Sequence, residues 1–126
     1  MENVLLLLER NIIRSTLARD INDSCNMQVL LEHNYNNIPK AFKEYYPDIA
    51  VIEMHENYPQ KGKDPLEASS TIKGICPSCK VILLCPENIS ACVEFAVNAK
   101  KTNKIDDFVF ANDSFSYLIS KLESFA

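Results

Sequence analysis

Glu53 stands at the end of an apolar run and is the residue best placed for chemistry. The run, residues 47–54, is rich in β-branched side chains, which is typical of a strand buried on both faces of a parallel sheet. Because a charge is not tolerated unpaired inside such a strand, Glu53 is expected at its carboxyl end. In open α/β sheets this edge is where ligands bind. The sequence therefore predicts a site around Glu53.

A second candidate is the pair Cys76 and Cys79, which are separated by two residues. A redox pair with this spacing has its nucleophilic cysteine at a helix N-terminus, where the pKa of the thiol is lowered, whereas this pair falls in a predicted helix-to-strand connection. A structural zinc site needs four ligands, and the sequence has no second CxxC motif and no paired histidines. Turn-forming cysteines are the simpler interpretation. A thiol- or metal-responsive protein that uses Cys76, Cys79 and Cys85 is the alternative.

Several other classes of function lack support in the sequence. There is no Ser-His-Asp set, and two glycines, Gly62 and Gly74, cannot build a glycine-rich phosphate loop, so we expect no enzyme. The net charge of −4 argues against nucleic-acid binding. No run approaches the about 18 apolar residues that span a membrane. The five cysteines, an odd number, indicate reduced thiols and a cytoplasmic location.

Short apolar runs alternate with helical stripes along the chain. Strands are predicted over 3–9, 26–32, 47–54, 80–85 and 105–111. The helices between and after them are predicted from Asn11, over 38–45, from Pro65 with Asp64 as the N-cap, over 86–100, and after the cap Asn112. Right-handed crossovers then give an α/β fold, a parallel sheet covered by helices on both faces. The 126 residues have room for one domain, 1–126.

This arrangement resembles the response-regulator receiver domain of two-component signalling over the whole chain. Residues 47–54 look like the phospho-acceptor strand of that family, and Asp64-Pro65-Leu66-Glu67 looks like the start of its third helix. The segment 105–109 resembles the one that carries an aromatic switch residue. The resemblance implies a flavodoxin-like, doubly wound (βα)5 sheet with strand order 2-1-3-4-5.

The resemblance also assigns a role to individual positions. The two acids that hold Mg²⁺ in the family fall on Leu8 and Glu9, the phosphorylated aspartate on Glu53, a carbonyl that helps to bind metal on His55, the hydroxyl residue on Cys85, the switch aromatic on Phe108, and the phosphate-binding lysine on Ala111.

Several of these positions have lost the chemistry that the role needs. Leu8 offers no oxygen to Mg²⁺, Glu53 is one methylene longer than aspartate, and Ala111 carries no cation. We therefore expect no efficient phosphorylation and no cofactor, with at most weak Mg²⁺ binding through Glu9, Glu53 and the backbone of His55. Glu53 is then either a permanent mimic of the charged acceptor or a decayed site, and both alternatives stay open.

We interpret the chain as a degenerate receiver, or pseudo-receiver, that signals by protein–protein contact. In the family, the fourth helix, fifth strand and fifth helix form the partner and dimer surface, which corresponds here to residues 86–125. Self-association through this surface is left open, as is weak phosphorylation of Glu53. Since no output domain follows Ala126, the chain is expected either to act as a single domain or to be an excised piece.

Overall fold

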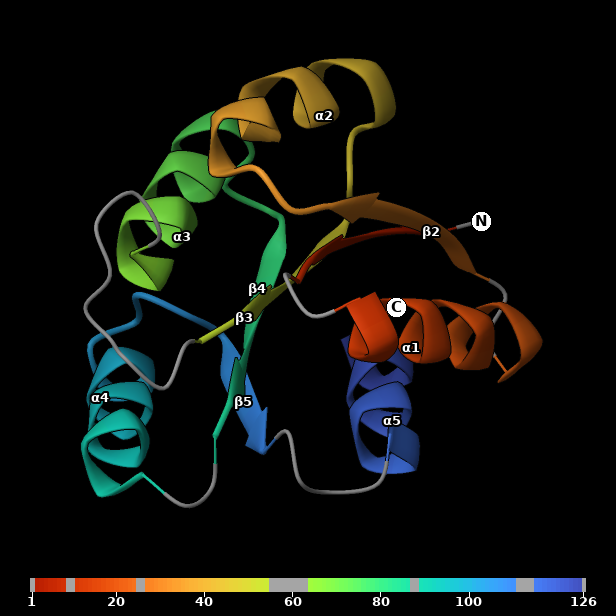
Figure 1. Ribbon diagram of the computed structural model, residues 1–126. Helices are drawn as coiled ribbons and strands as arrows, with labels where there is room; N and C mark the ends of the chain where they lie inside the picture. The colour runs from red at the N-terminus through yellow and green to blue at the C-terminus, as the bar shows by residue number, and fades with distance from the viewer. Residues whose placement is uncertain are drawn as a thin grey trace.

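Five parallel strands form one sheet in the order β2-β1-β3-β4-β5 (Figure 1). The computed structural model describes residues 2–8, 11–24, 27–54, 64–86, 89–110 and 115–125. The strands are β1 (Glu2–Leu7), β2 (Met27–Glu32), β3 (Ile49–Glu53), β4 (Lys80–Cys85) and β5 (Asp107–Phe110). The helices are α1 (Asn11–Ser24), α2 (Ile38–Tyr45), α3 (Pro65–Ile75), α4 (Ser90–Lys101) and α5 (Phe115–Phe125), with a short 3-10 turn, η1 (Tyr35–Asn37), before α2. The predicted doubly wound topology is confirmed.

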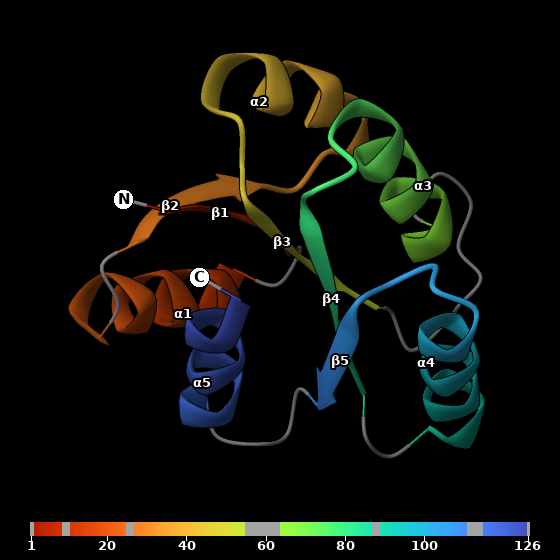
Figure 2. The same ribbon diagram turned by 180° about the vertical axis from the view of Figure 1, so that it is seen from behind.

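Helices cover both faces of the sheet. Helices α1 and α5 lie together on one face, and α2, α3 and α4 lie on the other, as the two opposite views show (Figures 1 and 2). Successive residues of a strand alternate between these two cores. In β3, Ile49 and Val51 face α1 and α5, whereas Ala50 and Ile52 face the other three helices. All five residues of β3 are buried, which explains why this strand is a continuous apolar run in the sequence.

The start of α3 is the one predicted from the sequence. The Asp64 side chain accepts a hydrogen bond from the Leu66 amide at 2.9 Å, and Pro65 occupies the first helical position. Proline is suited to that position because its missing N–H would have no partner within the helix.

Other boundaries differ from the prediction. Strand β1 covers Glu2–Leu7 instead of 3–9, β2 starts at Met27 instead of residue 26, and β3 covers Ile49–Glu53 instead of 47–54. Helix α4 begins at Ser90 and not at residue 86, because Ile89 is extended (φ −119°, ψ 102°) and its carbonyl accepts the first helical hydrogen bonds, from Cys92 and Val93. Strand β5 covers only Asp107–Phe110 of the predicted 105–111. The predicted cap Asn112 lies outside the described residues. None of the helices in the described ranges is long and apolar enough to cross a membrane.

Candidate functional site

Glu53 is the last residue of β3, which lies in the centre of the sheet. Its side chain is only 3% exposed. The ladder to β4 continues past it, since the Met54 amide donates to the Leu84 carbonyl at 2.9 Å. By strand alternation Glu53 lies on the face of Ile49 and Val51, toward α1 and α5. The carboxyl edge of the sheet thus presents a buried carboxylate.

Leu8 follows β1, the strand next to β3, at the same edge. It is fully buried, belongs to the core under α1 and α5, and donates its amide to the Glu32 carbonyl at 3.2 Å. A hydrocarbon therefore fills the position where the receiver resemblance places an acid. Within the described ranges, no three His, Cys, Asp or Glu side chains come together as a metal site. Glu9 and His55, two other positions that the resemblance assigns to Mg²⁺ binding, lie outside the described residues.

Cys85 ends β4 and is fully buried. It packs in the core under α2, α3 and α4, on the face opposite to that of Leu8. Burial, and secondarily the neighbouring Cys92, raises the pKa of the Cys85 thiol to about 11. Its Sγ lies 3.8 Å from the Pro86 carbonyl oxygen. Cys85 is therefore a neutral core residue and does not offer the hydroxyl that the corresponding receiver position supplies.

Phe108, where the resemblance places the switch aromatic, lies on β5 and is half-buried. Its ring meets the ring of Phe110 edge-on, with centroids 5.9 Å apart and an interplanar angle of 73°. Both rings pack against the core under α2, α3 and α4. Ala111, the position of the receiver lysine, lies outside the described residues.

Cys76 and Cys79 form a turn between α3 and β4, as predicted. The Cys79 amide donates to the Cys76 carbonyl at 3.0 Å, and neither residue is in a disulfide. Burial is the main cause that raises the pKa of the Cys79 thiol to about 12, and Cys76 adds to it. Cys85 lies at the other end of strand β4, six residues after Cys79 and therefore about 20 Å from it at 3.3 Å per residue. The three cysteines therefore do not converge on one site.

An ionic cluster at the amino end of β5 was not predicted from the sequence. Oδ2 of Asp106 accepts hydrogen bonds from Lys73 Nζ at 2.5 Å and from the Val81 amide at 2.8 Å. Lys73 also donates to the Cys79 carbonyl at 3.1 Å. These bonds tie α3 to the start of β4 and to the segment that leads into β5.

Asp107 extends the cluster to two further helices. Its Oδ1 accepts from Lys100 of α4 at 3.1 Å and from the Phe108 amide at 2.8 Å, and its Oδ2 lies 2.7 Å from Lys121 Nζ of α5. Burial alone would raise the pKa of Asp107, but the hydrogen bonds from Lys121, Phe108 and Lys100 outweigh burial and hold that pKa below its usual value. The sequence does contain a signal for this cluster. Two consecutive acids stand at the start of an apolar strand, where unpaired charges are not tolerated, so both acids need cationic partners.

Comparison with known proteins identifies the class of this fold. No protein-family model matches the chain, and no curated protein matches it. Among solved structures, a LuxR-family DNA-binding response regulator from Staphylococcus aureus matches with a TM-score of 0.79 and 19% identity over 99% of this chain and 98% of that one.

Two further structures give a similar result. A response regulator receiver domain protein from Clostridium thermocellum matches with a TM-score of 0.80 and 15% identity, covering 99% of this chain and 94% of the other. An adenylate cyclase from Rhodopirellula baltica matches with a TM-score of 0.83 and 14% identity over 98% and 86% of the two chains. The chain thus has the fold of response-regulator receiver domains, as the sequence resemblance predicted.

Proposed function

We propose that this chain is a cytoplasmic signalling module that acts by contact with a protein partner and not by phosphoryl transfer. The observation that carries the proposal is Leu8, a fully buried hydrocarbon at a position where receivers hold Mg²⁺ with an acid. Phosphoryl transfer to a carboxylate depends on positioning and on a metal ion that neutralises charge. With Leu8 in the core, the site loses one of the oxygens that octahedral Mg²⁺ requires. The proposal includes no cofactor, at most weak Mg²⁺ binding, and no enzymatic activity.

The burial of Glu53 supports the same conclusion. A phosphodonor must bring its phosphoryl group into contact with the acceptor oxygen, whereas the Glu53 side chain is 3% exposed. Cys85 on the adjacent strand supplies a buried thiol of raised pKa in place of a hydroxyl. Under the proposal Glu53 is a fixed acid, either as a mimic of the charged acceptor or as the remnant of one.

The surface of α4, β5 and α5 is the proposed partner site. Asp107 supports this choice because it joins Lys100 of α4 and Lys121 of α5 to β5, so that the three elements form one connected surface. On α5, Tyr117 is 50% exposed, and Lys121 lies over its ring at 5.6 Å from the centroid. A large exposed aromatic next to charged groups is typical of an interface residue.

The intact mass of the protein after incubation with acetyl phosphate and Mg²⁺ tests the absence of phosphoryl transfer. An unmodified chain is the expected result, with an authentic receiver domain treated in parallel as the positive control. One added phosphoryl group that disappears in Glu53→Gln would contradict the proposal and establish the alternative, a weakly phosphorylated receiver. The Glu53→Gln chain must first be shown to fold, by circular dichroism, because the side chain is buried.

The partner surface is tested with two matched variants. Tyr117→Glu and Ile75→Glu replace residues of similar exposure, 50% and 46%, on α5 and at the end of α3. A protein that co-purifies with the wild-type chain should be lost with Tyr117→Glu and retained with Ile75→Glu. Retention with Tyr117→Glu would place the contact elsewhere.

The thiol-sensor alternative gains no support, since Cys79 and Cys85 are buried and lie at opposite ends of β4.

A further inference from the structure

Strand β2 is an edge of the sheet, paired with β1 on one side only. Its sequence, MQVLLE, contains no proline, glycine or lysine, and its one charge stands at the end of the strand. Natural edge strands are usually protected from pairing with other chains by lysine, proline or a bulge. Strand β2 carries none of these, and its six residues pair with β1 in an uninterrupted register.

The direction of the backbone shows which residues of β2 could pair with another strand. The Glu32 carbonyl accepts the Leu8 amide, so the polar groups of Glu32 are directed to β1. Successive residues of a strand direct their amide and carbonyl groups to opposite sides, which places those of Val29 and Leu31 on the free edge. These two residues offer two donors and two acceptors to a strand placed alongside.

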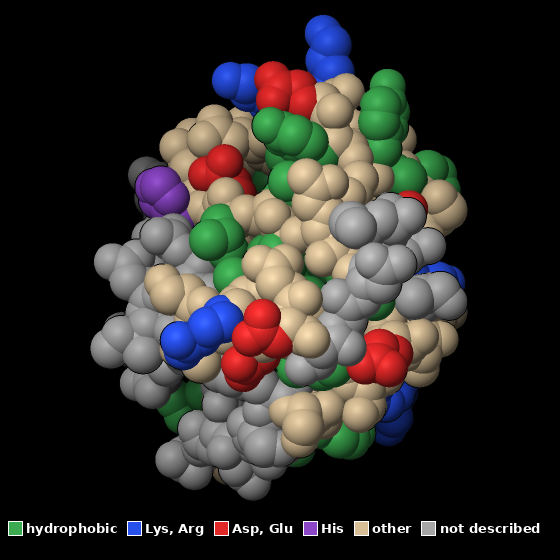
Figure 3. All heavy atoms as spheres, turned by 90° about the vertical axis from the view of Figure 1, so that its right-hand side faces the viewer, with side chains coloured by type: hydrophobic (Ala, Val, Ile, Leu, Met, Phe, Trp, Pro, Cys, Tyr) green, Lys and Arg blue, Asp and Glu red, His purple; other side chains and the backbone are tan. Residues whose placement is uncertain are grey.

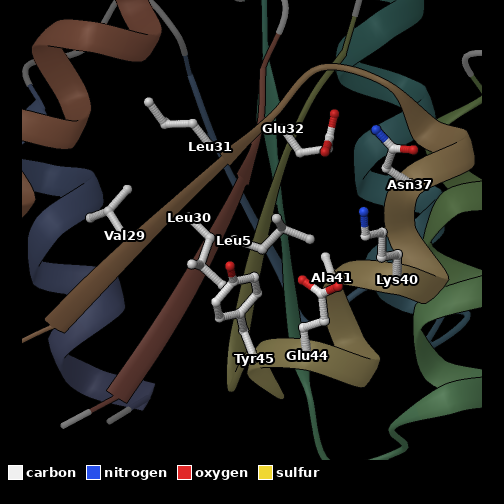
Figure 4. Close-up of a pocket in the computed structure, with 10 residues that line it drawn as sticks. All are labelled: Leu5, Val29, Leu30, Leu31, Glu32, Asn37, Lys40, Ala41, Glu44 and Tyr45. Carbon is white, nitrogen blue, oxygen red and sulfur yellow. The ribbon is translucent and has the colours of Figure 1, made fainter.

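A groove lies between β2 and α2, with a volume of about 370 Å³. Figure 4 shows its floor, where Leu5 and Leu30 lie on the same side of the strand as Ala41 and Tyr45 of α2. Tyr45 is 47% exposed. Leu31 is 48% exposed and points to the other side of the strand. Apolar side chains therefore flank the free edge on both faces, and the view onto this side of the molecule shows hydrophobic side chains at the surface among scattered charges (Figure 3).

We propose that β2 pairs with β2 of a second copy of this chain, antiparallel across a two-fold axis, to form a continuous ten-stranded sheet. The register that places Leu30 opposite Leu30 of the partner subunit also places Val29 opposite Leu31 of the partner subunit. Val29 and Leu31 both direct their backbone polar groups outward, so this pair exchanges two backbone hydrogen bonds. The two-fold axis generates the pair twice. Leu30 and its counterpart then form a pair without backbone hydrogen bonds, in which side chains approach most closely.

The strand is complementary to itself, which favours a second copy as the occupant. In this register Gln28 lies opposite Glu32 of the partner subunit, so an amide faces a carboxylate and no like charges oppose each other. The Glu32 carboxylate is already oriented, since it accepts the amides of His33 and Asn34, each at 3.0 Å. The partner's Leu30 would lie over the apolar floor of the groove, beside Tyr45 and Ala41. This interface is separate from the proposed partner surface on α4, β5 and α5.

Sedimentation velocity over a range of concentrations tests the dimer. The wild-type chain should sediment as a dimer at tens of micromolar, and Leu31→Lys should raise the dissociation constant at least tenfold. Ile75→Lys is the matched control, because Ile75 is 46% exposed and lies at the end of α3, and it should leave the dimer unchanged. A wild-type monomer at all concentrations would overturn the proposal. A dimer that survives Leu31→Lys would also overturn it. If that dimer is lost with Tyr117→Glu, the copies associate through the surface of α4, β5 and α5 instead.

Engineered cysteines test the register independently of Leu31→Lys. In a background with Cys25→Ser and Cys76→Ser, Leu30→Cys should form a disulfide-linked dimer under mild oxidation, because the two-fold axis places residue 30 opposite itself. Gln28→Cys is the control, since residue 28 lies opposite residue 32, and it should remain largely uncrosslinked. Equal crosslinking of the two variants, or none with Leu30→Cys, would contradict the proposed pairing.

Discussion

Lys121 Nζ lies 2.7 Å from Oδ2 of Asp107 and joins the last helix to the first residue of the last strand. Lys100 of α4 reaches the other oxygen of the same carboxylate at 3.1 Å. One buried acid, with a side chain 10% exposed, therefore holds two helices that cover opposite faces of the sheet. The surface proposed for partner binding depends on this carboxylate for its shape.

Asp107→Asn should destabilise the protein. The amide cannot replace the charge that both lysines need, and the lysines would face a neutral group. Loss of hydrogen bonds to a charged, buried group typically lowers the free energy of unfolding by about 1.5–3 kcal/mol. Urea unfolding at pH 7 measures the difference, with Glu94→Gln on the exposed face of α4 as the control. If the two variants unfold at the same urea concentration, the ionic pairs of Asp107 contribute nothing to stability.

The contribution of Asp107 should also depend on pH in a defined direction. Its pKa is lower in the folded chain than in the unfolded chain, so the folded state binds fewer protons around acidic pH. The stabilisation is then complete above the ordinary aspartate pKa of about 4 and is lost as the pH falls through the lower, folded pKa. The gap in stability between wild type and Asp107→Asn should be constant from about pH 8 to 5 and shrink below about pH 4. A gap that grows on acidification would mean that folding raises the pKa of Asp107 instead of lowering it.

The thiols should react at very different rates in the folded protein. Burial raises the pKa of Cys79 to about 12 and that of Cys85 to about 11, whereas Cys76 is only half-buried. Because the thiolate is the reactive form, iodoacetamide at pH 8 should modify Cys76 well before Cys79 or Cys85. Peptide mass mapping after timed quenching measures each rate, and the unfolded chain in urea gives the reference. Rapid modification of Cys85 would show that the carboxyl edge is open and would revive the thiol-sensor alternative.

The individual strands and helices were predictable because most of them leave a local signal in the sequence. Strands buried on both faces are continuous apolar runs, as 80–85 shows, and the predicted bounds of β4 match those observed. Asp64 followed by Pro65 marks the start of α3, because the interactions that begin the helix involve only residues 64–66. The order of the strands came from the family resemblance, since periodicity does not determine which strands are neighbours.

The ionic cluster was not predictable in the same way. Lys73 is 33 residues from its partner Asp106, and only the packing of α3 beside the β4–β5 edge brings them together. The sequence shows that Asp106 and Asp107 need cations, but several lysines are available to each. The start of α4 was predicted wrongly because it also depends on tertiary packing. Ile89 is extended and packs against the core, although an isoleucine at this position also suits a helix.

Substitutions of Leu8 distinguish two interpretations of this position. Residue 8 is either part of the hydrophobic core or part of a receiver metal pocket that has lost one acid. Leu8 is fully buried among the apolar residues under α1 and α5, so Leu8→Ala should lower the free energy of unfolding by about 2–5 kcal/mol. Leu8→Asp should cost more than Leu8→Ala, because it adds a buried carboxylate to the lost packing. Urea unfolding with and without 10 mM Mg²⁺, roughly a saturating concentration for a weak site, compares the two variants. We expect Mg²⁺ to leave both midpoints unchanged. If Leu8→Asp proves milder than Leu8→Ala and Mg²⁺ raises its midpoint, residue 8 lines a metal pocket that a single acid restores.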